Sequence, residues 1–243
     1  MAAFIQTVDA LGADAGRELS WRERGWLLVV AAAAYATTLW PTPVLRVWVR
    51  DLAGRPGYAG AWLVLEHLLL YTTLCAAVCL GVWAGFSRWG WLPAPRSWLG
   101  FGERKWFTLA WGVGAGLAAV LLYVCLRLLA HRLGLLPGQW EPSLHPPEGW
   151  KVLGNVFSNF YEELIYRGFL LVVARAVLRS TPLAIVVTSL VFGLTHVQQL
   201  PMFRVLIVGA GMVMALACVR TRSIWAAWLC HQVYDVLLSM MVG

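Results

Sequence analysis

Three apolar, membrane-length segments in the C-terminal part of the chain contain ionisable residues that could do chemistry. They are Glu162, Glu163 and Arg167 in NFYEELIYRGFLL, His196 in LVFGLTHV, and His231 with Asp235 in WLCHQVYDVLL. At bilayer depth each charged side chain costs roughly 2.5–3.5 kcal/mol on insertion scales. Because such residues persist inside apolar segments where they pair or act in function, these six form the candidate site.

The first segment separates two glutamates by their position on a helix. Glu163 and Arg167 are four residues apart, so an α-helix places them on one face, where they can form an ion pair. Glu162 points about 100° away from that face and lacks this partner. Asn159, one turn earlier, can hydrogen-bond to either carboxylate. We therefore expect Glu163 and Arg167 to brace the helix and Glu162 to be available as a base, the alternative being a purely structural network.

The other two segments place histidines at helical spacing from further candidate residues. Phe192 lies one turn before His196, and His231 lies one turn before Asp235, so each pair shares a face. A lone histidine in an apolar helix is often only a satisfied core residue. A His–Asp pair, however, can orient an imidazole, bind a metal or face a developing oxyanion. All three sites fall near the middle of their apolar runs, which predicts that they meet at one depth.

The composition indicates an integral membrane protein. Hydrophobic residues make up 60% of the chain and charged residues 13%, and the mean hydropathy is +0.69. A soluble domain carries about 25% charged residues. Many of the 15 tryptophans lie near the ends of apolar runs, where the ring suits the headgroup region. The net charge of +7 comes from arginines in short loops, which favours contact with the lipid bilayer and excludes nucleic acid as the expected partner.

The apolar runs predict an all-α, polytopic transmembrane helical bundle of about seven to eight helices. The runs lie at about 25–45, 60–86, 106–130, 151–174, 182–199, 204–220 and 223–242. An eighth helix arises if part of the polar connection enters the membrane. Basic residues are more frequent in the loops that lie inside when the N-terminus is cytoplasmic, which favours that topology for a multi-pass protein of the cell membrane.

The runs also divide the chain into four predicted parts. These are an N-terminal cytoplasmic or interfacial segment at 1–24, three transmembrane helices within 25–130, a polar loop at 131–150, and a core of four transmembrane helices at 151–243 that carries all three motifs. Glycines at GxxxG spacing, Gly81 with Gly85 and Gly112 with Gly116, predict two places where helix backbones approach closely.

The three segments resemble the motifs of a known family. EELIYR, at 162–167, is similar to the EExxxR motif of the CPBP group, which includes type II CAAX prenyl endopeptidases and bacteriocin-processing proteins. FGLTH, ending at His196, is similar to the FxxxH motif of that group, and HQVYD, from His231, to its third motif of HxxxN type. Their order and internal spacing also agree, and the resemblance covers about residues 150–240.

The resemblance implies an intramembrane endopeptidase of the glutamate type. Glu162 and His196 would hold and activate a water that attacks the scissile carbonyl, with no cofactor. Glu163 and Arg167 would brace their helix, and His231 with the residue at 235 would stabilise the oxyanion. The implied substrate is a membrane-associated protein or peptide. A carboxylate in an apolar, poorly solvated site is a stronger base than one in water, which suits this role for Glu162.

Asp235 departs from the pattern, because the third motif commonly ends in Asn. An ionised aspartate repels an oxyanion, so either Asp235 is protonated or it orients His231, which then donates. The same change opens a metal-dependent alternative, since Glu162, His196, His231 and Asp235 are together a plausible zinc set. The metal-free mechanism is the favoured hypothesis.

Two further classes of protein remain as alternatives at this stage. Some relatives of the family act through partner contact, so a non-catalytic membrane binding or immunity protein fits the same motifs. A proton-coupled transporter also uses buried Glu and His residues. Its expected mark is an internal repeat with broken helices at matching positions, and the sequence has no such repeat.

Overall fold

The computed structural model of the 243-residue chain describes residues 18–39, 76–100, 105–135, 146, 149–196 and 201–241. Within these ranges every regular element is a helix, which confirms the all-α class for the described part. The elements are α2 (Trp21–Leu39), α5 (Ala76–Arg88), α6 (Arg96–Leu99), α7 (Lys105–Arg132), α8 (Gly149–Glu163), η2 (Leu164–Leu170), α9 (Leu171–Leu178), α10 (Thr181–Thr195), α11 (Pro201–Thr221) and α12 (Ile224–Met241).

Two of the described helices are long and apolar enough to cross a membrane. They are α7, with 28 residues and a mean hydropathy of 2.1, and α11, with 21 residues and a mean hydropathy of 2.2. Helices α5 and α10 are apolar but shorter. Much of the second predicted run, and most of the polar loop, lie outside the described residues, so the number of spans stays a prediction.

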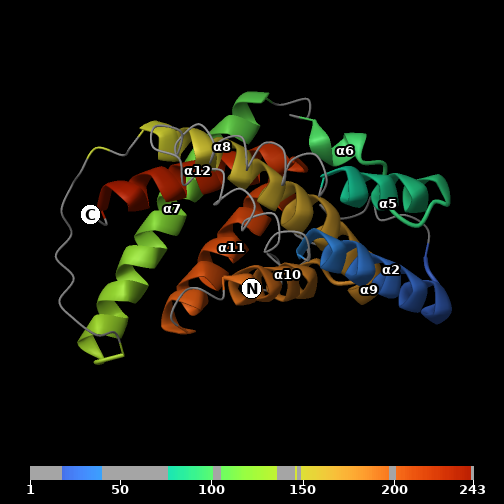
Figure 1. The fold of residues 1–243 in the computed structure, drawn as a ribbon, viewed down its shortest axis with the longest axis horizontal. Coiled ribbons are helices and arrows are strands. Elements are labelled where there is room, and N and C mark those ends of the chain that lie inside the picture. Colours follow the sequence, from blue (N-terminus) through green and yellow to red (C-terminus); the bar gives the residue numbers. More distant parts are fainter. Residues whose placement is uncertain are drawn as a thin grey trace, which may run out of the picture.

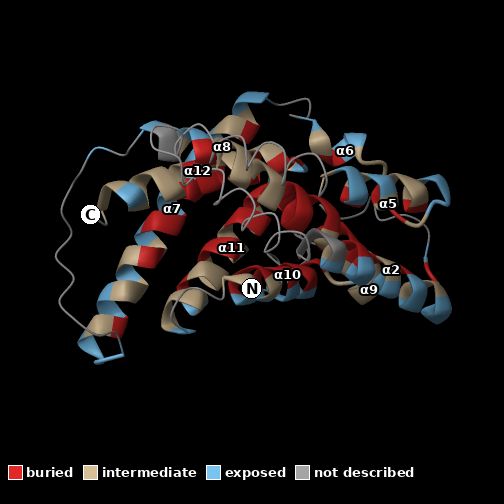
Figure 2. Cartoon of the chain, in the orientation of Figure 1, coloured by how far each residue is buried: buried red, intermediate tan, exposed pale blue. Residues whose placement is uncertain are grey.

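The helices pack around a short central segment, η2. Helices α7, α11 and α12 pack against one another, α10 packs against α11, and α2 packs against α5 and α9 (Figure 1). Segment η2 contacts α5, α8, α9, α10, α11 and α12. Buried residues are concentrated around this centre (Figure 2), and they include the charged side chains of Glu163 and Arg167. The first motif therefore lies in the most enclosed part of the described structure.

The fourth predicted run is a composite helix instead of one continuous α-helix. It extends from α8 through η2 to α9, and the seven residues of η2, directly after Glu163, form a π-helix. Short π segments inside α-helices are rare in proteins, and those that exist are often found at functional sites. Gly168 lies in this wide turn, where a Cβ atom would come within 3.3 Å of the Trp83 ring.

One of the two predicted glycine contacts is observed. A Cβ atom on Gly112 would lie 3.0 Å from the Ala226 carbonyl oxygen, and one on Gly116 would lie 2.9 Å from that of Cys230. The absence of side chains on α7 thus lets α12 approach closely, as the GxxxG spacing predicts. At Gly81 and Gly85 a Cβ atom would meet no described atom within 4 Å, so no close helix contact is seen there.

Candidate active site

The three motifs meet around the ring of Phe192, a buried residue of α10. The ring centroid lies 4.8 Å from that of His196 and 5.8 Å from that of His231, both edge-on. The guanidinium carbon of Arg167 lies 4.2 Å from the same centroid, at cation–π distance. The structure thus brings the segments from η2, α10 and α12 together, and Phe192 is the side chain that they share.

Beside this cluster lies a cavity of about 240 Å³. Its polar lining includes His196, His231 and Asp235, and its aromatic lining includes Tyr123 and Phe203. A space of this size accommodates several water molecules, and ionisable groups at its wall are placed to act on them. The cavity is thus the part of the described structure in which hydrolytic chemistry can take place.

Glu163 connects two of the motifs from a fully buried position. Its Oε1 atom accepts a hydrogen bond from Arg167 Nη1 at 2.8 Å, which confirms the predicted pair. The same oxygen accepts from His231 Nδ1, also at 2.8 Å. Arg167 continues the network by donating from Nη2 to the carbonyl oxygen of Gly211 at 3.3 Å. Glu163 therefore stabilises its own composite helix through Arg167, and it also joins α8 to α12 through His231.

His231 lies between two carboxylates. With Nδ1 donating to Glu163, the other ring nitrogen, Nε2, lies 3.6 Å from Asp235 Oδ2. Asp235 Oδ2 in turn accepts from Asn159 Nδ2 at 2.9 Å. Asn159, expected to bond to one of the glutamates, reaches across to α12 instead. The amide fixes Asp235 next to the imidazole, an arrangement in which Asp235 orients His231.

His196 lies at the end of its helix, which corrects the expectation of a position near the middle of an apolar span. Helix α10 ends at Thr195, and His196 is its C-terminal cap with φ −80° and ψ 53°. The reason is local. The backbone N–H of His196 donates to Gly193 O at 3.3 Å instead of to Phe192 O, the acceptor in a continued α-helix.

The ring of His196 has a defined tautomer in this position. Its Nδ1 atom lies 2.8 Å from the carbonyl oxygen of Phe192. A carbonyl oxygen only accepts hydrogen bonds, so Nδ1 bears the proton and the neutral ring presents an unprotonated Nε2. This nitrogen can hold a water or take up a proton.

Glu162 is the less constrained of the two glutamates, as predicted. It is half-buried, and within the described structure its carboxylate has no hydrogen-bond partner, in contrast to Glu163. It lies within coulombic range of His196, His231 and Asp235. The second carboxylate of the motif is thus engaged in structure, while the first interacts electrostatically with groups of the other two motifs.

The donor set of the zinc hypothesis does not form a metal site in this arrangement. In the part of the chain that the structure describes, no three His, Cys, Asp or Glu side chains are grouped so as to hold a metal ion. Nδ1 of His196 and Nδ1 of His231 are each engaged by an oxygen atom, and Asp235 is engaged by Asn159. A histidine that binds a metal through Nε2 commonly donates from Nδ1 to an oxygen atom in this way, so the choice between the metal-free and the metal-dependent mechanism stays a prediction.

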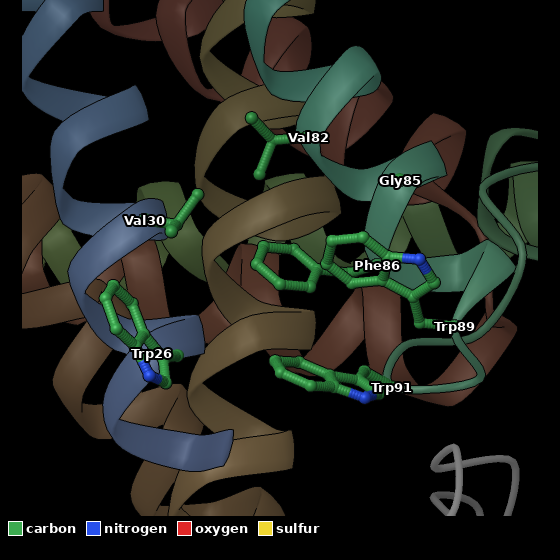
Figure 3. A pocket seen from close by; sticks show the side chains of 7 residues that line it. All are labelled: Trp26, Val30, Val82, Gly85, Phe86, Trp89 and Trp91. Atoms are coloured by element: carbon green, nitrogen blue, oxygen red, sulfur yellow. The ribbon is translucent and has the colours of Figure 1, made fainter. Parts of the chain in front are cut away.

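A second cavity, of about 380 Å³, lies between α2 and α5 (Figure 3). Trp26 and Val30 of α2 lie on one side of it and Val82 and Phe86 of α5 on the other, with Trp91 stacked on Phe86. Its described lining is apolar and contains no titratable side chain. It cannot supply hydrolytic chemistry and is distinct from the candidate site.

Sequence reasoning missed a tyrosine of α7 that lines the candidate site. Tyr123 contributes to the cavity wall and accepts a hydrogen bond at its hydroxyl from Arg127 Nη1 at 3.1 Å. The signal was present, because Arg127 is an arginine within an apolar run and follows Tyr123 by one helical turn. Its position at the site follows only from the packing of α7 on α11 and α12.

Comparison with known proteins identifies the segment that carries the motifs. Residues 149–237 match the family model described as "Type II CAAX prenyl endopeptidase Rce1-like". No curated protein and no solved structure matches the chain. The matched segment runs from the start of α8 past Asp235 and contains all three motifs. This segment of the chain is thus similar to the family of Rce1-like type II CAAX prenyl endopeptidases.

Proposed function

We propose that the chain is a multi-pass intramembrane endopeptidase of the glutamate type, with Glu162 and His196 activating the attacking water. The observation that carries the proposal is the hydrogen bond between His196 Nδ1 and the Phe192 carbonyl at 2.8 Å. It leaves Nε2 as a proton acceptor at the cavity, within coulombic range of the Glu162 carboxylate. Two acceptors of this kind can bind one water and remove its proton.

The proposed reaction proceeds through a tetrahedral intermediate. Glu162 takes a proton from the water as its oxygen forms a bond to the scissile carbonyl carbon, and the carbonyl oxygen becomes an oxyanion. The proton is then delivered through Glu162 or His196 to the leaving nitrogen, and the C–N bond breaks. The products are a carboxylic acid and an amine, so one water is consumed and no covalent enzyme intermediate forms.

His231 is the proposed donor to the oxyanion. Its Nδ1 proton is already given to Glu163, so a donor at Nε2 requires a second ring proton and hence an imidazolium. The carboxylates of Glu163 and Asp235, on opposite sides of the ring, stabilise that positive charge. Asp235 thus acts in this proposal by orienting and charging His231, which accounts for an aspartate at a position where an asparagine is common.

The proposed substrate is a membrane-associated protein or peptide cut near the membrane surface. The family description supports peptidase activity on such substrates. The cavity of about 240 Å³ has room for a peptide group and a water but not for a folded domain. No described feature of the site favours a non-catalytic binding role.

The proposal is tested in cells that produce the full-length chain. Terminal proteomics compares membrane proteins from cells with the wild type and cells with the double variant Glu162→Gln, His196→Ala at equal expression. New protein termini that depend on the wild type are the expected result. Equal termini in both cultures would contradict peptidase activity. Loss of cleavage by the purified protein with a chelator, restored by zinc, would contradict the metal-free mechanism.

A further inference from the structure

A series of hydroxyl groups leads from α2 to the histidine of the second motif. The hydroxyl oxygen of Tyr35, in α2, lies 2.9 Å from that of Tyr166, in η2. The Tyr166 hydroxyl also lies 2.9 Å from Thr195 Oγ1, at the end of α10. Thr195 Oγ1 donates to the carbonyl oxygen of Phe192 at 2.7 Å. The acceptor at the end of this series is the same oxygen that binds His196 Nδ1.

The direction of each hydrogen bond in the series follows from the last one. The carbonyl of Phe192 can only accept, so the single hydroxyl proton of Thr195 is used there. Thr195 must then accept from Tyr166, whose own proton is thereby used, and Tyr166 must accept from Tyr35. The series is therefore polarised toward the Phe192 carbonyl, and such chains strengthen their members.

The Phe192 carbonyl is available to side chains because the helix ends there. In a continued α-helix this oxygen would accept from the backbone N–H of His196. That N–H donates to Gly193 O instead, and the oxygen receives the Thr195 hydroxyl and the His196 ring. A carbonyl oxygen has two lone pairs, so these two donors occupy it fully. The position of the imidazole is thus coupled to the position of the threonine hydroxyl.

We propose that Tyr35, Tyr166 and Thr195 are positioning residues that fix the ring orientation and the Nδ1–H tautomer of His196. The inference rests on the proposed function for the role of His196, but its geometry stands on the contacts above. In a histidine the bond made by one nitrogen sets the protonation of the other. Because Tyr35 lies outside the segment 149–237 that matches the family, α2 completes the site from another part of the chain.

The test measures the tautomer of His196 directly, by ¹⁵N NMR of the full-length protein with labelled histidine in detergent micelles. The His196→Ala variant assigns the signal. We expect the wild type to show the Nδ1–H form. Thr195→Val and Tyr166→Phe should show a mixture of tautomers, because the His196 ring is then no longer held in place and can turn away from the Phe192 carbonyl. Thr195→Ser keeps the hydroxyl and should keep the wild-type spectrum.

Thr188→Val is the matched control. Thr188 is a buried threonine of the same helix, and its hydroxyl donates to the backbone carbonyl of Ala184, one turn earlier in that helix. It should leave the tautomer unchanged. A wild-type tautomer in Thr195→Val and Tyr166→Phe would overturn the inference. So would an equal change in Thr188→Val, because the effect would then be one of general packing.

A kinetic measurement separates positioning from fold and from the proposed function. With a peptide that spans a cleavage site found in cells, Tyr35→Phe and Tyr166→Phe should lower kcat about tenfold and leave KM unchanged. In a His196→Ala background the same substitutions should cause no further loss, because they act through that residue. Additive losses would overturn the inference. Tautomer changes in a chain without peptidase activity would support the inference and contradict the proposed function alone.

Discussion

Glu163 and His231 lie 68 residues apart in the sequence and are joined by a 2.8 Å hydrogen bond between Oε1 and Nδ1. The bond connects the first motif to the third, and the ion pair with Arg167 at the same oxygen extends it along η2. It divides the glutamate pair by role, since Glu163 is committed to structure while Glu162 has no such bond and lies within coulombic range of His196 and His231. It also decides which nitrogen of His231 can face a substrate.

Removing Glu163 should destabilise the protein strongly. Glu163→Ala leaves the buried Arg167 guanidinium without its carboxylate, and breaking a buried pair in this way costs about 3–5 kcal/mol. Thermal unfolding of the purified protein in detergent measures the effect. Because Arg167→Ala removes the stranded charge, the double variant should be no less stable than Glu163→Ala. An unfolding temperature unchanged in Glu163→Ala would contradict a bracing role.

Restoring the more common residue at position 235 should preserve activity. In Asp235→Asn the side-chain oxygen still accepts from Asn159, and Glu163 still stabilises the His231 imidazolium. The new amide can itself donate toward the oxyanion and so offset the loss of the Asp235 charge. We expect kcat/KM to remain near that of the wild type. Asp235→Leu removes both the acceptor for Asn159 and any polar group that can assist the oxyanion, so its kcat/KM should fall at least about tenfold. Equal inactivity of Asp235→Asn and Asp235→Leu would show that the negative charge itself is required.

The packing of α7 on α12 should be sensitive to a single methyl group. In Gly116→Ala the added Cβ would lie 2.9 Å from the Cys230 carbonyl, so α12, which carries His231, must shift. Overpacking of this kind costs about 1–3 kcal/mol. Gly114→Ala is the matched control on the same helix, because its Cβ meets no described atom within 4 Å. Unfolding temperatures that are equal in the two variants would contradict close packing at Gly116.

Apart from the close approach of α7 and α12 at Gly112 and Gly116, the contacts that could be predicted from the sequence are those within a single helix. The four-residue spacing of Glu163 with Arg167 and of Phe192 with His196 predicts both contacts. Both are observed, the first although Arg167 lies in the π segment η2. The long apolar runs also predict helix positions well, since the run at 106–130 corresponds to α7 at Lys105–Arg132. Local periodicity fixes these features whatever the neighbouring helices do.

The hydrogen bonds between helices could not be predicted, because they depend on how the helices rotate and slide against one another. The bond from Glu163 to His231 and the one from Asn159 to Asp235 are of this kind. The π turn after Glu163 changes the angular offset of every later residue in that helix, and hydropathy carries no signal for it. The end of α10 at Thr195 depends on side-chain donors that compete for the Phe192 carbonyl.

The central claim, that Glu162 is the base that activates water, is tested most directly by kcat for Glu162→Gln with a cleaved peptide. Glu18→Gln is the matched control, because the Glu18 side chain is 87% exposed and forms only an exposed ion pair with Arg179 at 3.6 Å among the described residues. Loss of a general base predicts a fall in kcat of about 10²- to 10⁴-fold, with unchanged unfolding temperature and unaltered activity in Glu18→Gln. A folded Glu162→Gln protein that keeps the wild-type kcat would contradict the account.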